Sequence, residues 1–503
     1  MVHTRMNIAD PQFFILTLAL IGVVIIIAAL LSGLIDRSDV PQVGVFLALG
    51  AALGPAGLGL LDVTLDSPIL RVVATLCLTL VLFTDAVSLR IAEMRRHARL
   101  AFMVVGPGTL LTAGLIALAG WYLLDLSPAA AAVLGAALAS TDPVMLRGLV
   151  RRPALPEPVR LALRLESGLN DIVLLPIILV ALPFLTNGHL LTLSDWASIA
   201  LDFLLLGPGA GIAVGLLGLA ALDMIRRKIG VRRDYESLYS LGVAFTAYAA
   251  AESVHGSGFL AAFAAGITIA ALDIDLCDCF LEYGETTAEM ALLFAFVLFG
   301  SSLIWTGFTV LNVSVLLFAV AVVLIRVVAF SAALAAMHLS TSECLLIAWF
   351  GPRGLSSLLL VLIPVFVGAP GADRLFHVAC FVVLFSVVLH GGSLMFLGRG
   401  QRARTLGPAA GENVRGDGAD NAAVAMSPAP SGEENPERIS IAEMQRLKQS
   451  GAPLLVLDAR SERSFADDPR RAEAALRIPP DAVARRVAEL NVPKNTWLIL
   501  FCA

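Results

Sequence analysis

The feature that most constrains this chain is a succession of apolar runs, each about 20 residues long, separated by short polar segments. A helix of that length spans the hydrocarbon core of a bilayer. With 58% hydrophobic and 15% charged residues, and a mean hydropathy of +0.85, the composition excludes an ordinary soluble domain. We therefore predict an all-α polytopic membrane protein with about thirteen transmembrane helices, at residues 13–35, 42–61, 69–89, 99–124, 128–149, 160–185, 196–224, 236–255, 257–273, 285–306, 309–338, 342–366 and 372–397.

The basic residues of the connecting segments indicate the orientation. Lys and Arg gather after odd-numbered spans and are nearly absent after even-numbered ones, as the segments 89–99, 147–160, 226–233 and 398–404 show. Because cytoplasmic loops carry the excess of basic residues, we expect the N-terminus outside and the C-terminus in the cytoplasm, in the plasma (inner) membrane. Residues 13–35 lack the pattern of a cleaved signal peptide and are expected to be a retained first helix.

Two of the predicted spans are interrupted near their middle. The segment "AALASTDPVML" (136–146) has Thr141 and Asp142 beside a proline, and "AWFGPRGLSS" (348–357) has Arg353 in a Gly-Pro break. The two spans run in opposite directions, and such a pair indicates a transporter built from inverted repeats. We expect the two discontinuous helices to cross, with Asp142 and Arg353 compensating the dipoles of the half-helix ends. Two ordinary proline kinks are the alternative, but kinks would not need the charges.

A third span is unusually polar for an apolar helix. The segment "LRLESGLNDIVLLP" (163–176) contains Glu166, Ser167, Asn170 and Asp171. A carboxylate at the bilayer centre costs at least about 2.5–3.5 kcal/mol, so such residues line a polar cavity or pair with another charge. Ser167 and Asp171 share one helical stripe, and Glu166 and Asn170 share another. Glu166 and Asp171 lie about 140° apart around the helix and must face different partners.

The two carboxylates of this span differ in the partner that the sequence offers. Arg326 lies deep in the span 309–338 and is the natural counter-ion of Glu166, so we interpret these two as a structural ion pair. Asp171 has no such basic partner. Either a proton or a cation would neutralise it, and hard cations prefer the oxygen ligands that Asp171, Ser167, Thr141 and broken-helix carbonyls would supply. A satisfied structural carboxylate is the alternative reading of Asp171.

These motifs together resemble the monovalent cation:proton antiporter-1 family, the NhaP-like sodium/proton exchangers. The resemblance extends over residues 13–397 and is carried by Arg326 and, in order along the chain, by "STDPV" (140–144), "ESGLND" (166–171), "HGSGFLAAFAAGI" (255–267) and "GPRG" (351–354). It implies a homodimer in which a core domain moves against an interface domain to give alternating access.

The resemblance also implies roles for single residues. Asp171 would bind the cation or the proton, Thr141 and Ser167 would ligate the cation transiently, and Asn170 would brace Asp142 at the crossing. Asn rather than Asp at position 170 resembles the electroneutral branch of the family. The expected function is exchange of Na⁺ (or Li⁺) for H⁺ in pH and sodium homeostasis, with K⁺/H⁺ exchange as the alternative. We expect no cofactor. The expected partners are membrane lipid and a second copy of the chain, and we expect no nucleic acid.

The residues after the last span have a different composition. Residues 404–438 are rich in Gly, Pro, Ala and charge, which predicts a flexible linker. In 439–503, the strand-like runs "PLLVLDAR" (453–460) and "TWLILFCA" (496–503) are similar to part of a rhodanese-like cytoplasmic domain. The active-site loop expected after Cys502 is missing from this sequence, so we expect no sulfur transfer and leave the tail's partner open. A membrane-anchored sensor or sulfurtransferase is the alternative to a transporter, but an anchor would not need carboxylates inside the membrane.

Overall fold

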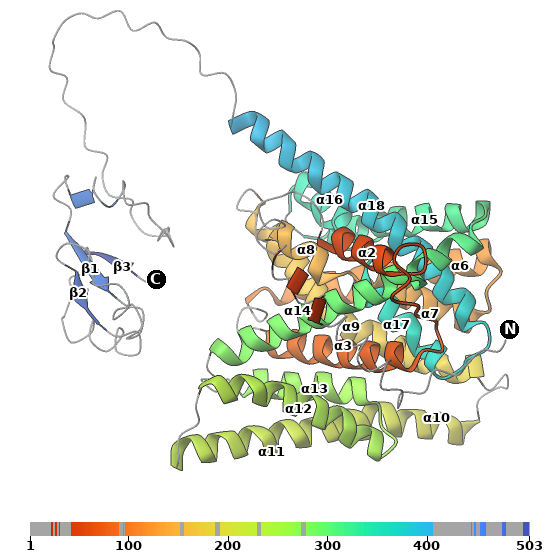
Figure 1. The fold of residues 1–503 in the computed structure, drawn as a ribbon, viewed down its shortest axis with the longest axis horizontal. Helices are drawn as coiled ribbons and strands as arrows, with labels where there is room; N and C mark the ends of the chain where they lie inside the picture. Colours follow the sequence, from red (N-terminus) through yellow and green to blue (C-terminus); the bar gives the residue numbers. More distant parts are fainter. Residues whose placement is uncertain are drawn as a thin grey trace, which may run out of the picture. The chain divides into compact units, whose positions relative to one another are not determined.

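Two units make up the chain, Met1–Ala409 and Ala410–Ala503. The computed structural model describes nearly all of the first unit from residue 42 on, and three short stretches of the second. The described ranges are 42–89, 96–150, 155–186, 192–228, 233–272, 278–337, 339–405, 453–458, 475–478 and 496–501, with a few single positions between them. In these ranges the regular secondary structure of the first unit is all helical (Figure 1).

Helices occupy every predicted span from 42–61 to 372–397. Of the first predicted span, 13–35, only five residues are described, and all five are helical. The helices are α2 (Gln42–Leu53), α3 (Pro68–Val87), α5 (Ala98–Met103), η1 (Val104–Gly108), α6 (Thr109–Leu124), α7 (Pro128–Ala139), α8 (Pro143–Val150), α9 (Glu157–Thr186), α10 (Leu193–Ala200), η2 (Leu201–Leu206), α11 (Gly207–Lys228), α12 (Arg233–Ser253), α13 (Gly258–Ala271), α14 (Asp278–Ser301), η3 (Leu303–Val310), α15 (Val313–Leu334), α16 (Thr341–Trp349), α17 (Leu355–Phe366) and α18 (Ala372–Thr405).

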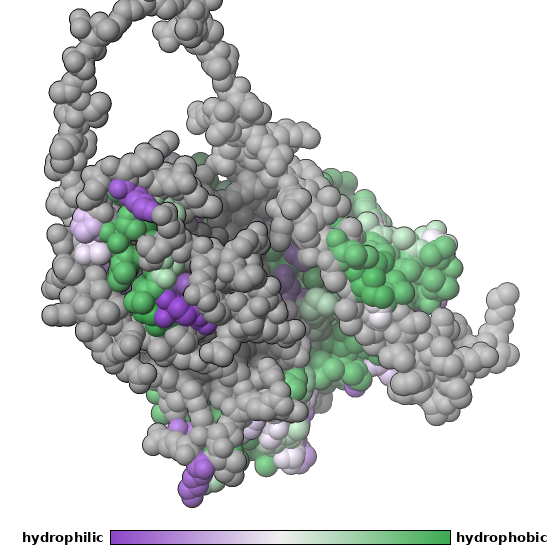
Figure 2. Space-filling model, turned by 60° about the vertical axis from the view of Figure 1, so that its left-hand side comes forward, coloured by the Kyte–Doolittle hydropathy of each residue, from purple (hydrophilic) through white to green (hydrophobic). Residues whose placement is uncertain are grey.

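The helix lengths and surfaces are those of a polytopic membrane protein. Among the described residues, 7 helical stretches are long and apolar enough to cross a membrane, or 8 if the bent pair α14–η3 counts as one. Helices α2, α13 and α17 are apolar but shorter. Large apolar side chains such as Leu217, Leu324 and Val328 lie on the outside, and Figure 2 shows broad hydrophobic patches on the described surface. The predicted fold class is confirmed.

Three helical irregularities were not predicted from the sequence. η1 is a π-helical stretch that contains Pro107, and η2 is a second π-helical stretch just before Pro208. Proline removes a backbone donor, which the local change of helix type accommodates. The chain also bends by 48° between α14 and η3. The expected straight spans 99–124, 196–224 and 285–306 are therefore each built from more than one piece.

The two predicted breaks are present and touch each other. α7 ends at Ala139 and α8 begins at Pro143, whereas α16 ends at Trp349 and α17 begins at Leu355. The N–H of Asp142 in the first break donates to the carbonyl of Pro352 in the second, at 3.0 Å. The interrupted helices therefore meet at their non-helical segments, as predicted.

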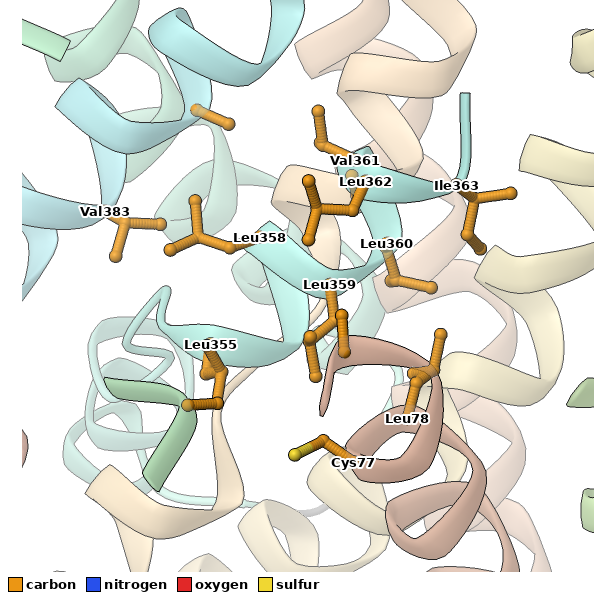
Figure 3. Packing of buried hydrophobic residues seen from close by; sticks show 14 of the residues in the cluster. Cys77, Leu78, Leu355, Leu358, Leu359, Leu360, Val361, Leu362, Ile363 and Val383 are labelled. Carbon is orange, nitrogen blue, oxygen red and sulfur yellow. The ribbon is translucent and has the colours of Figure 1, made fainter. Parts of the chain in front are cut away.

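Helix α17, which follows the second break, lies in the middle of the apolar core. All of its residues from Leu355 to Pro364 are buried. Figure 3 shows its leucines extending on several sides of the helix, with Leu78 of α3 and Val383 of α18 nearby. Because these residues are buried within the protein, neighbouring helices rather than lipid cover α17 over this stretch. This packing holds the start of α17, and with it the crossing, in place.

The second unit contains a small parallel sheet. Its strands are β1 (Leu454–Asp458), β2 (Leu476–Arg477) and β3 (Trp497–Phe501), in the order β2-β1-β3. β1 and β3 coincide with the two strand-like runs of the sequence. Nearly all of the predicted linker 404–438 lies outside the described residues, as does Cys502, so the rhodanese-like assignment stays a prediction.

The close packing of α11 on α13 gives a first prediction. A side chain at Gly211 of α11 would overlap the backbone of Ala261 in α13, whereas Gly209 on the same helix faces open space. We expect Gly211→Leu to push the helices apart and to lower stability by about 1–3 kcal/mol. The melting temperature of detergent-purified protein measures the effect. Gly209→Leu is the control and should melt like the wild type; equal melting of both variants would contradict the contact.

Candidate functional site

The first break is fastened to the polar helix α9 by two adjacent hydrogen bonds. The Ser140 hydroxyl donates to Asp171 Oδ1 at 2.9 Å, and the Asn170 side-chain amide donates to Thr141 Oγ1 at 2.9 Å. The structure thus brings together Thr141, Asn170 and Asp171, three of the residues that the sequence analysis singled out. It adds Ser140, which the sequence analysis did not assign. The available signal was its place at the end of α7, where the helix breaks.

Asp171 differs from the other carboxylates at the crossing in its surroundings. Its exposed fraction is 7%, against 1% for both Asp142 and Glu166. Within the described part of the chain, no basic side chain forms an ion pair with Asp171, and its hydrogen bond comes from the neutral Ser140. Asp171 is therefore the least buried of these three carboxylates, and no basic residue of the described chain pairs with it.

The Asp142 carboxylate caps the amino-terminal ends of two half-helices, α8 and α17. Its Oδ1 accepts a hydrogen bond from Val144 N at 2.8 Å in α8, and its Oδ2 accepts one from Leu355 N at 2.7 Å in α17. A carboxylate at a helix N-terminus satisfies free N–H groups and the positive end of the dipole. Any side chain at Gly354 would overlap this carboxylate, so the close approach requires glycine. Asp142 thus occupies the compensating position that was predicted for it.

The Arg353 guanidinium caps the carboxyl-terminal end of α7. Its Nη1 donates to the carbonyls of Ala139 and Ser140, at 2.9 and 3.3 Å, and the Ser357 hydroxyl also donates to the Ser140 carbonyl, at 3.2 Å. These two break carbonyls are therefore occupied by donors. The next carbonyl, that of Thr141, accepts no hydrogen bond from the residues that the structure describes.

Arg326 makes several contacts, of which the sequence predicted the one with Glu166. Its guanidinium forms a buried bidentate ion pair with Glu166, in which Nη1 contacts Oε1 and Nη2 donates to Oε2 at 2.8 Å. Nη2 also donates to the carbonyls of Ile347 and Phe350, at 3.1 and 3.3 Å, and so caps the carboxyl-terminal end of α16. The ring of Phe330 lies 4.2 Å from the guanidinium carbon. The expected contact with Glu166 is present, and the capping of α16 was missed.

Oxygen atoms suited to a cation gather beside Asp171. Asn170 Oδ1 is buried and has no hydrogen-bond donor among the described residues, and the Thr141 carbonyl is likewise vacant there. Buried acceptors without donors are rare in folded proteins, and a bound cation would satisfy them. Ser167 lies on the same helical face as Asp171, but its hydroxyl donates within its own helix, to Arg164 O at 3.4 Å. Thr141, Asn170 and Asp171 thus take part in the contacts between α9 and the first break, whereas the Ser167 hydroxyl bonds within its own helix.

Comparison with known proteins agrees with this geometry. Residues 20–400 match the family described as "Sodium/hydrogen exchanger, transmembrane". The chain belongs to this family. The resemblance to the cation:proton antiporter family, drawn from the motifs of the sequence, is confirmed.

Three relatives named as cation/proton antiporters share between 26% and 28% of their aligned residues with this chain. The chain is 26% identical over 388 residues to the K(+)/H(+) antiporter NhaP of Alkalimonas amylolytica, covering 75% of this chain and 66% of the relative. It is 26% identical over 381 residues to the K(+)/H(+) antiporter NhaP2 of Shewanella sp. (strain ANA-3), covering 73% and 64%. It is 28% identical over 311 residues to the Na(+)/H(+) antiporter NhaH of Halobacillus dabanensis, covering 57% and 72%.

The solved structure extends the likeness to the fold. The sodium proton antiporter MjNhaP1 of Methanocaldococcus jannaschii, determined at pH 8, matches with a TM-score of 0.62 and 20% identity. The match covers 75% of this chain and 99% of that one. The helical unit therefore has the fold of MjNhaP1. The chain spans slightly less than two thirds of the length of the first two relatives.

The buried ion pair gives a second prediction. Glu166→Gln should destabilise the protein by about 3–5 kcal/mol, because it leaves the Arg326 charge buried without its counter-ion. The melting temperature in detergent measures the loss. Glu157→Gln, at the exposed start of the same helix, is the matched control and should change stability by no more than about 0.5 kcal/mol. A Glu166→Gln protein that melts like this control would show that the pair is dispensable.

Proposed function

We propose that this protein is a secondary antiporter that exchanges a monovalent cation for a proton, with Asp171 as the exchanging carboxylate. One observation carries the proposal: Asp171 has no basic partner among the described residues, whereas Asp142 caps two helix ends and Glu166 pairs with Arg326. The relatives NhaP, NhaP2 and NhaH are all named cation/proton antiporters, which supports the proposal.

The exchange follows from the charge of a single group. In the ionised form the Asp171 carboxylate attracts a cation, and in the protonated form it is neutral and releases the cation. Because each ligand neutralises the same group, binding of one excludes the other. Asn170 beside it carries no charge, so one cation leaves for each proton that enters, and transport is electroneutral. Opening the site to one side and then to the other, by movement of the helices that carry it, completes alternating access.

The ligands of the cation would all be oxygen atoms. The Asp171 carboxylate, the Thr141 hydroxyl and carbonyl and Asn170 Oδ1 form this set, with Ser167 as a further ligand on the same face of α9. Na⁺ or Li⁺ fits such a hard oxygen site, and so does K⁺. K⁺ is the second candidate, because NhaP and NhaP2 are named K⁺/H⁺ antiporters.

We further propose a plasma (inner) membrane location with the N-terminus outside, a homodimeric assembly, and a role in pH and sodium homeostasis. The orientation rests on the basic segments after odd-numbered spans. The match of the exchanger family over residues 20–400 supports a transporter over a membrane-anchored sensor.

Transport by everted vesicles gives the third prediction. A preformed proton gradient, followed with a pH-sensitive dye, should dissipate when Na⁺ or K⁺ is added, and the cation that works at lower concentration is the substrate. Asp171→Asn should abolish the response, because an amide cannot alternate between a proton and a cation. Asp373→Asn, which changes an exposed carboxylate at the start of α18, should transport normally. Normal transport by an Asp171→Asn protein would refute the assignment.

The role of Thr141 gives the fourth prediction. Thr141→Val keeps the shape of the side chain but removes the hydroxyl that accepts from Asn170. We expect the cation concentration for half-maximal transport to rise roughly fivefold to tenfold, as for the loss of one polar contact worth about 1–1.4 kcal/mol. Thr141→Ser retains the oxygen and should remain near the wild-type value. An unchanged half-maximal concentration for Thr141→Val would remove the Thr141 side chain from the ligand set.

A further inference from the structure

A pair of polar side chains on α18 contacts the break between α16 and α17. The proposed exchange assigns no role to this pair. Ser386 and His390 lie one turn apart on α18, and both are buried. Ser386 Oγ accepts a hydrogen bond from the backbone N–H of Arg353 at 2.7 Å. His390 Nε2 lies 3.1 Å from the carbonyl of Trp349, the last residue of α16. One turn of α18 therefore contacts both the end of α16, at Trp349, and the non-helical segment that follows it, at Arg353.

The hydrogen-bond roles of this pair follow from their neighbours. Ser386 Oγ already accepts from Arg353, so its own hydrogen is available to His390 Nδ1, which lies 3.1 Å away. With Nδ1 as acceptor, the neutral imidazole carries its hydrogen on Nε2 and donates it to the Trp349 carbonyl. The Ser386 carbonyl also lies 3.0 Å from Nδ1, but in this tautomer it receives no hydrogen from the imidazole. A side chain that both accepts and donates is needed to bridge the two ends.

The contacts between α18 and the second break resemble the contacts between α9 and the first break. α9 follows the α7–α8 break and fastens it through Asn170 and Asp171. α18 follows the α16–α17 break and fastens it through Ser386 and His390. In an inverted-repeat transporter these helices are counterparts.

Arg353 connects the contacts that α18 makes with one break to the contacts that α9 makes with the other. Its backbone is held by Ser386, while its guanidinium donates to the carbonyl of Ser140, at 3.3 Å, whose hydroxyl donates to Asp171. A shift of the segment that carries Arg353 would therefore move Ser140 relative to the carboxylate. Each step is a direct contact between buried groups.

We propose that His390, together with Ser386, is a positioning residue for cation exchange: it holds the α16–α17 break so that Arg353 keeps Ser140 aligned on Asp171. The inference rests on the proposed function, because its effect is on the exchanging carboxylate. His390 itself binds neither the cation nor the exchanged proton.

Transport kinetics in everted vesicles test the proposal. His390→Ala should raise the half-maximal cation concentration by about threefold to tenfold, and Ser386→Ala should change it in the same direction. His390→Gln should restore it to within about twofold of the wild type, because glutamine can accept from Ser386 and donate to Trp349. His377→Ala, another histidine of α18 that contacts neither break among the described residues, is the control and should behave as wild type.

A double variant separates positioning from a general structural effect. If His390 acts through Ser140, then His390→Ala combined with Ser140→Ala should be no worse than Ser140→Ala alone, whereas independent effects would multiply. The proposal is overturned if the effects multiply, if His390→Gln fails to rescue, or if His390→Ala lowers only the amount of folded protein at an unchanged half-maximal concentration. Wild-type vesicles that show no cation response would instead refute the proposed function.

Discussion

The structure depends on closing four helix ends that meet inside the apolar core. Asp142 accepts hydrogen bonds from the first residues of α8 and α17, Arg353 donates to the last carbonyls of α7, and Arg326 donates to those of α16. Unsatisfied backbone groups in a bilayer cost several kcal/mol each, so the interrupted helices would not persist without these side chains. Gly354 permits the close approach that Asp142 requires.

The charges at the crossing leave Asp171 unbalanced. Asp142 and Glu166 are negative, Arg326 and Arg353 are positive, and the four cancel in a connected set of caps and one ion pair. Asp171 is the additional carboxylate, held by the neutral hydroxyl of Ser140. A charge in a low-dielectric site must be neutralised, and a mobile cation or a proton can do so where no fixed basic residue is present. The proposed exchange is a consequence of this balance.

Much of this arrangement could be predicted from the sequence. The spans, the two breaks, and the contact between Glu166 and Arg326 follow from hydropathy, from proline, and from the high cost of an unpaired charge in lipid. The capping of α16 by Arg326 and the contact of Ser140 with Asp171 depend on how separate helices cross, which no local pattern specifies. The π-helical stretches were missed for a similar reason, since a proline such as Pro107 can be accommodated by a kink or by a change of helix type. The hydrogen bond from Asn170 to Thr141, the neighbour of Asp142, is another contact between separate helices that no local pattern specifies.

The competition between cation and proton at Asp171 can be measured without transport. Purified protein in a weakly buffered detergent solution, with a pH-indicator dye, reports protons released when Na⁺ or K⁺ binds. At a pH low enough that Asp171 is protonated before the cation is added, the account predicts that the wild type releases about one proton for each cation bound, and that Asp171→Asn releases none. Cation binding by the wild type with no proton release, or equal release by both proteins, would contradict it.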